Sequence, residues 1–232
     1  MLGASVERPT PMLGRIALRR GRLALTMGQQ GRAAVFFQQG LDDCLRSYDK
    51  RVLYGFLGQA QLAADQGDYP RAFMRLRDAE RLMQQRQIPD TVYRGVLLQV
   101  SSEFWLQQGR PELAREALSR VLRHYRGPRA RQAPPATLEL VPRIECLLIL
   151  SETRLHQMQT SLVRLRALLT SAQARGMVRL EAELLLTLTE VALILGEPDQ
   201  ARSFFDQGCQ IITRCSLQQM LAELYIRCVE RS

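Results

Sequence analysis

Apolar residues recur along this chain at the spacing of one helix face, in segments that end at glycine or begin at proline. After Gly67, the residues Ala72, Leu76 and Ala79 follow at offsets of five, nine and twelve. On a helix of 3.6 residues per turn these offsets lie on one face. The two alanines leave room for a neighbouring helix, and the leucine between them fills the remaining gap. The stretch from Gly67 to Ala79 therefore predicts a turn followed by the inner face of a second helix.

The same spacing recurs at regular intervals. The equivalent residues are Ala33, Phe37 and Gly40 after Gly28; Ala114, Leu118 and Val121 after Gly109; and Ala201, Phe205 and Gly208 after Gly196. A weaker copy has His156 in the glycine position, followed by Ser161, Leu165 and Leu168. The steps between successive copies are 39, 42, 47 and 40 residues. A near-constant step of this size indicates an array of helical repeats.

The pattern predicts an all-α fold: a right-handed superhelix of about five helix pairs plus a C-terminal helix. One repeat domain is expected over residues 10–231, after a flexible segment at 1–9. The expected pairs cover residues 10–47, 50–86, 90–125, 137–175 and 178–214, and the last helix covers 216–231. Residues 125–136 hold three prolines, one glycine and three arginines without periodicity, which predicts a loop. This loop is either a solvated connector or a basic arm that contacts nucleic acid.

The net charge of +9 comes almost entirely from arginine, because Lys50 is the only lysine. Arginine binds phosphates and base edges well, so the excess raises the possibility of nucleic-acid binding. A GC-rich genome, which encodes arginine where others encode lysine, explains the same excess. The arginines are spread over every repeat, so we expect no direct sequence-specific DNA binding by this chain.

The chain shows no pattern typical of catalysis or metal binding. Its five cysteines include no C-x-x-C pair, and its two histidines stand in no metal-ligand motif. We therefore expect no enzyme activity, no catalytic residues, no cofactor and no metal site. No run approaches the ~20 apolar residues that span a bilayer, and the first residues do not resemble a secretory signal. The cysteines are expected to be free thiols in a reducing compartment. A cytoplasmic protein without membrane contact is predicted.

The first helix of each pair is expected to line a concave groove. Counting back from each turn, polar residues recur at groove-facing offsets and form the candidate ligand or partner site: Arg15, Arg22, Tyr54, Gln61, Gln99, Glu103, Arg143, Glu183 and Glu190. The first four suit an anionic or polyhydroxyl ligand or an acidic peptide, and the two glutamates near the other end would make the groove negative there. The alternative is a solvated face, with Arg15 and Arg22 paired to acids such as Asp42 or Asp43.

The glycine-alanine-aromatic signature resembles the tetratricopeptide repeat, although these units average about 42 residues against the usual ~34. The stretches LLTLTEVALILGEPDQARSFFDQGCQII and VYRGVLLQVSSEFWLQQGRPELAREALSRVL are similar to the helical sensor domain of large ATP-dependent, LuxR-class (MalT-like) transcriptional regulators. The resemblance implies a sensor domain that binds a small inducer, partner protein domains or both in its groove. It also implies an ATPase before this domain and a helix-turn-helix DNA-binding domain after it in the parent chain. A free-standing tetratricopeptide adaptor that binds a protein or peptide is the alternative.

Overall fold

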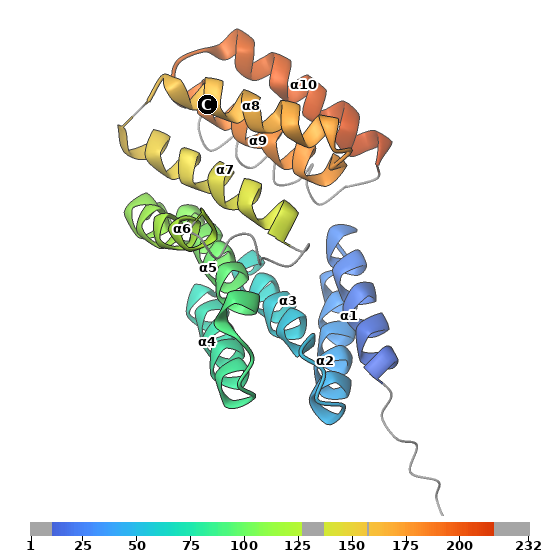
Figure 1. Ribbon diagram of the computed structural model, residues 1–232. Coiled ribbons are helices and arrows are strands. Elements are labelled where there is room, and N and C mark those ends of the chain that lie inside the picture. The colour runs from blue at the N-terminus through green and yellow to red at the C-terminus, as the bar shows by residue number, and fades with distance from the viewer. Residues whose placement is uncertain (1–10, 127–136, 157, 216–232) are drawn as a thin grey trace, which may run out of the picture. The chain divides into compact units, whose positions relative to one another are not determined.

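The computed structural model describes residues 11–126, 137–156 and 158–215, and this part of the chain is all-α (Figure 1). It contains ten helices and no strand within those ranges, so the predicted fold class is confirmed. The helices are α1 (Pro11–Thr26), α2 (Gln30–Arg46), α3 (Val52–Asp65), α4 (Tyr69–Gln85), α5 (Asp90–Gln107), α6 (Pro111–Arg126), α7 (Thr137–His156), α8 (Thr160–Ala174), α9 (Val178–Ile194) and α10 (Pro198–Arg214). Their order matches the five expected pairs. The expected segments 1–9 and 216–231 lie outside the described residues, as does 127–136; α6 continues through the first two residues of the expected loop.

The glycines that mark the repeats adopt the backbone conformation that ends a helix. Gly67 has φ of +77°, in the left-handed region that residues with a side chain avoid. Beyond it, the Asp68 N–H donates to the Ala63 carbonyl at 2.9 Å, and the Asp68 side chain then accepts from Arg71 N at the start of α4. Gly28, Gly109 and Gly196 have similar φ values. Each of these turns therefore reverses the chain within a few residues.

The described residues form two compact units, divided between Tyr93 and Arg94 in the first turn of α5. In the first unit α1 packs on α2, α2 on α3 and α3 on α4, and α1 also contacts α3. In the second unit α6 packs on α7, α7 on α8 and α9, α8 on α9, and α9 on α10. The right-handed superhelix over all five pairs stays a prediction.

The core of the first unit is organised around the ring of Phe37 on α2. A Cβ added to Gly21 of α1 would lie 2.8 Å from this ring, and one added to Gly58 of α3 would lie closer still. The ring therefore occupies the space left by two glycines on neighbouring helices. Leu41 is also buried, whereas the neighbouring Phe36 is only half-buried.

The core of the second unit is built mainly from leucine and isoleucine. Leu118, Ile144, Leu165, Leu184 and Leu188 are all fully buried. Every residue of α9 from Leu184 to Ala192 is buried, so this stretch forms an internal helix. None of the described helices has the length and apolar character needed to cross a membrane.

In the last pair, the aromatic position differs from the pattern. Phe204 is buried there, and Phe205 is half-buried beside a second small cluster that includes Leu186 and Ile212. The spacing pointed to Phe205 as the core ring. Both rings contact the core because α10 lies between two clusters.

The alanines at offset five are buried in all four strong copies, as predicted: Ala33, Ala72, Ala114 and Ala201. Replacing Ala72 with leucine adds volume at a helix crossing with no free space, and we expect this to reduce the free energy of unfolding by ~1–3 kcal/mol. The exposed Met74 on the same helix provides the control, because Met74→Leu should leave stability within about 0.5 kcal/mol. Equal urea midpoints for Ala72→Leu and the parent would show that the repeat register is wrong.

Candidate functional site

The four predicted site residues of the first unit lie on α1 and α3, which contact each other. Arg22 and Tyr54 are exposed. The Gln61 amide donates to Asp65 Oδ1 at 2.8 Å. Arg15 is paired, but its partner is Asp49, in place of the expected Asp42 or Asp43.

Asp49 forms hydrogen bonds with residues from several parts of the first unit. Its buried carboxylate accepts from Arg15 Nε at 2.6 Å and from the Arg51 backbone N–H at 2.9 Å. Its backbone carbonyl accepts from Arg86 at the end of α4 at 3.4 Å. Burial raises the pKa of Asp49, but the Arg51 N–H and the Arg15 guanidinium outweigh it, so the net pKa lies below its usual value. The resulting stabilisation is complete above the unfolded-state pKa of about 3.9 and is lost as pH falls through the lower folded-state pKa.

In the second unit, two of the predicted residues form a bidentate ion pair. Arg143 on α7 donates to both carboxylate oxygens of Glu183 on α9, at 2.7 and 2.8 Å. Arg179 also donates to Glu183, at 3.0 Å. Burial lowers the pKa of Arg143, but the carboxylates of Glu183 and then Glu103 outweigh it and raise the pKa overall. The guanidinium is therefore held as a cation between acidic side chains.

The other predicted residues of this unit are also engaged internally. Gln99 is buried and donates to Glu103 at 2.9 Å. Glu190 is only 2% exposed. Its Oε1 accepts from Arg154 Nε at 2.9 Å, and Arg154 Nη1 donates to the Leu106 carbonyl at 2.6 Å. A ligand would have to displace Arg154 to reach this carboxylate.

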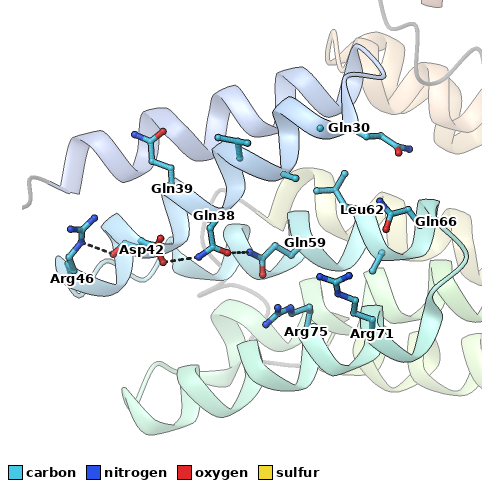
Figure 2. Close-up of a pocket in the computed structure, with 14 residues that line it drawn as sticks. Gln30, Gln38, Gln39, Asp42, Arg46, Gln59, Leu62, Gln66, Arg71 and Arg75 are labelled. Carbon is cyan, nitrogen blue, oxygen red and sulfur yellow. Dashed lines mark hydrogen bonds between the residues drawn. The ribbon is translucent and has the colours of Figure 1, made fainter.

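The first unit carries a hollow that the sequence did not indicate. It has a volume of about 840 Å³ and lies between α2, α3 and α4 (Figure 2). Five glutamines contribute to its wall: Gln30, Gln38, Gln39, Gln59 and Gln66. The remaining lining residues are Gly31, Ala34, Val35, Asp42, Arg46, Leu62, Ala63, Arg71 and Arg75. We call this hollow the glutamine groove; none of the predicted site residues lines it.

A chain of hydrogen bonds crosses the wall of the glutamine groove. Gln59 on α3 donates to Gln38 Oε1 at 2.9 Å, and Gln38 on α2 donates to Asp42 Oδ1 at 2.9 Å (Figure 2). Among the described residues, Gln59 Oε1 is a buried oxygen that accepts no hydrogen bond. Leaving a buried acceptor unsatisfied costs free energy, so a donor that reached Gln59 would be bound favourably.

Cationic side chains lie along the other side of the groove. Figure 2 shows Arg71 and Arg75 next to each other on α4, and Arg46 beside Asp42 on α2. Arg75 lies 3.5 Å from Asp78, and Arg46 lies 2.8 Å from Asp43. The Arg71 side chain is exposed at the edge of the groove. The two arginines on α4, Arg71 and Arg75, favour an anionic group at that side of the groove.

Sequence reasoning missed this groove because it assigned binding to the first helix of each pair. Two of the three helices here, α2 and α4, are second helices. The available signal was the polar surface of α2, where Gln30, Gln38 and Gln39 accompany the exposed apolar Val35. That combination is also common on solvated helices, so by itself it does not predict a groove formed with neighbouring helices.

The described residues contain no group of three or more side chains placed to hold a metal ion. No protein-family model matches this chain, and no curated protein matches its sequence. We therefore infer the function of this chain from the geometry of its described residues and from its repeat pattern.

Proposed function

We propose that this chain is a non-catalytic binding domain that holds a protein or peptide segment in the glutamine groove. The observation that carries the proposal is the groove itself, a hollow of about 840 Å³ whose wall includes five glutamine side chains. Each glutamine amide can donate and accept hydrogen bonds, which complements the N–H and C=O of a peptide group. The arginines on α4 favour a segment with acidic side chains.

The openness of the site favours a segment over a small molecule. Ala34, Val35, Gln38 and Gln39 line the groove and remain exposed to solvent. Sites for small ligands are usually enclosed and mostly apolar, with few polar groups. An open groove between helices is better suited to a chain that lies along it.

The resemblance to MalT-like regulators supplies a second candidate function, a sensor domain that binds a small inducer. The repeat-like helix pairs and the exposed Arg22 and Tyr54 on adjoining helices support it. In this version the partners include the ATPase and helix-turn-helix domains of a parent regulator. The two candidates differ in the surface used, α1 and α3 against the glutamine groove.

Selection from a phage library of random linear peptides on the immobilised chain tests the first candidate. We expect the selected peptides to be acidic, and we expect Arg71→Glu and Val35→Glu to weaken their binding by about tenfold or more, because each places a carboxylate at the groove. Arg77→Glu is the matched control, since Arg77 is exposed on α4 outside the groove. This variant should change the dissociation constant by less than about twofold.

The same measurement on Arg22→Ala and Tyr54→Ala separates the two candidates. If these variants lose binding while the groove variants keep it, the site is the predicted face of α1 and α3. Selection that yields no peptide dependent on either surface would overturn the proposal of a peptide-binding groove.

A further inference from the structure

The outward face of α1 carries a concentration of exposed apolar side chains. Met12, Leu13, Ile16 and Leu23 on α1, and Met27 directly after it, are between 46% and 62% exposed. These are five of the twelve large apolar side chains that are exposed among the described residues, and no other described helix carries more than one. Such a concentration marks an interaction surface more often than a scattered exposed residue does.

Four of these side chains form one stripe along the helix. At 3.6 residues per turn, Met12, Ile16, Leu23 and Met27 fall within about 60° of one another around the axis. The opposite face, which includes Ala17 and Gly21, is buried against the rest of the first unit. The stripe is therefore directed away from the core. Its spacings of four and seven residues, one and two helical turns, are spacings that a second helix would match.

The charge on α1 limits what can cover this stripe. The helix carries four arginines and no acidic residue: Arg15, Arg19, Arg20 and Arg22. Arg19 lies at one edge of the stripe, one turn from both Ile16 and Leu23, and Arg20 lies at the other edge. Arg20 is placed over the Phe36 ring at 4.5 Å. Because arginines flank the stripe on both sides, its partner should supply carboxylates beside apolar side chains.

We infer that the outward face of α1 docks an amphipathic helix of a partner protein, with an apolar stripe flanked by acidic side chains. A second copy of this chain fits less well, because it would bring Arg19 and Arg20 of both α1 helices together, and α1 supplies no acidic residue between them. A membrane surface also fits less well. Helices that bind membranes keep their arginines on the polar face, whereas Arg20 lies between Met27 and Leu13 around the axis of α1, inside the exposed apolar sector. This surface is separate from the glutamine groove, which lies on α2, α3 and α4.

The probe for this inference is a synthetic, side-chain-stapled helical peptide of about 18 residues, slightly longer than α1. It carries leucines at the inward heptad positions and glutamates on both flanks, and a second peptide carries lysines in place of the glutamates. Titration calorimetry with the whole chain should show binding of the glutamate peptide and at least about tenfold weaker binding of the lysine peptide. Arg19→Glu should reduce this preference.

Substitutions in the stripe locate the binding. Leu23→Glu should weaken binding of the glutamate peptide by about tenfold or more. The control is Val163→Glu, an exposed apolar position of the second unit on α8, which should leave binding within about twofold. Met12→Glu provides a second stripe variant, and a circular-dichroism melt verifies that each variant is folded. Arg71→Glu in the glutamine groove should not affect this peptide, so a failure here is distinct from a failure of the groove proposal.

Several outcomes would overturn the inference. Equal binding of both peptides, or full binding by Leu23→Glu, would exclude a charge-matched helix on this face. Binding to phosphatidylserine vesicles without binding to the peptide would identify a membrane as the occupant. A dimer of the parent chain in sedimentation that Leu23→Glu dissociates would identify a second copy.

Discussion

Replacing Glu190 with alanine is expected to reduce the free energy of unfolding of the second unit by about 3–5 kcal/mol. The carboxylate is buried and accepts two hydrogen bonds from Arg154, whose third donor group reaches the Leu106 carbonyl. Removing it leaves a largely buried guanidinium without its counter-charge. The cost of an unpaired charge in a low dielectric exceeds the cost of the small cavity that the substitution creates.

The single tryptophan of the chain provides the measurement. Trp105 lies on α5 and packs against the core of the second unit, so its fluorescence in a urea titration reports on that unit. Glu152→Ala is the control, because Glu152 pairs with Arg164 at a more exposed site. That substitution should cost under ~1 kcal/mol. Equal losses of unfolding free energy for the two variants would show that the Arg154–Glu190 pair stabilises the unit no more than an exposed ion pair does.

A double substitution separates the charge from the packing. With Arg154→Leu and Glu190→Leu combined, no charge is left unpaired, and the loss should be smaller than for Glu190→Ala alone. A double variant less stable than Glu190→Ala would mean that the hydrogen bond to Leu106, and not the ion pair, is the important contact.

The helices and their order could be predicted because they follow from local rules. Apolar periodicity locates the helix faces, and a glycine or proline marks most of the turns within a few residues. The turn after α2 has neither residue, and the turn after α4 has Pro89 but no glycine. There Tyr48 and Gln87 take φ values of +55° and +54°, in the region that usually requires glycine. Arg86 stacks on the Tyr48 ring at 5.2 Å and donates to the Leu45 carbonyl, so tertiary contacts support this conformation.

The partners of charged residues could not be predicted in the same way. Periodicity placed Glu190 on the groove-facing side of α9, where a ligand or partner contact was expected. It could not show that Arg154, 36 residues earlier, reaches that carboxylate. Arg15 on α1 and Asp49 in the turn between α2 and α3 are 34 residues apart. Such contacts depend on side-chain rotamers across two helices, so a polar residue on an inner face can equally be a ligand contact or an internal ion pair.

The glutamine groove illustrates the same limit for a binding surface. Its wall combines residues from three helices, and each of those helices taken alone has an ordinary amphipathic pattern. The hollow exists because small residues such as Gly31, Ala34 and Ala63 line it where α2 and α3 meet. A hollow is the space that side chains leave unfilled, and the pattern of one helix does not encode the volume left by its neighbours.

Replacing Phe37 with alanine should reduce the free energy of unfolding of the first unit by about 3–5 kcal/mol. The ring fills the space between Gly21 and Gly58, which have no side chains with which to close the cavity. Phe36→Ala is the neighbouring control with the same change of residue. Because the Phe36 ring is half-buried against Arg20, we expect a loss of about 1 kcal/mol. Hydrogen exchange of peptides from α1 to α4, followed by mass spectrometry, measures the effect on this unit alone.

A second substitution tests whether the contact with glycine is the cause. In the parent, Gly58→Ala places a methyl group against the Phe37 ring and should destabilise the unit by ~1–3 kcal/mol. In the Phe37→Ala background the methyl group has space, and the higher helix propensity of alanine should stabilise the unit by about 0.5–1 kcal/mol. The sign of the effect should therefore reverse between the two backgrounds. The same sign in both would show that Gly58 is not required by the ring, and that the core of this unit is held by other contacts.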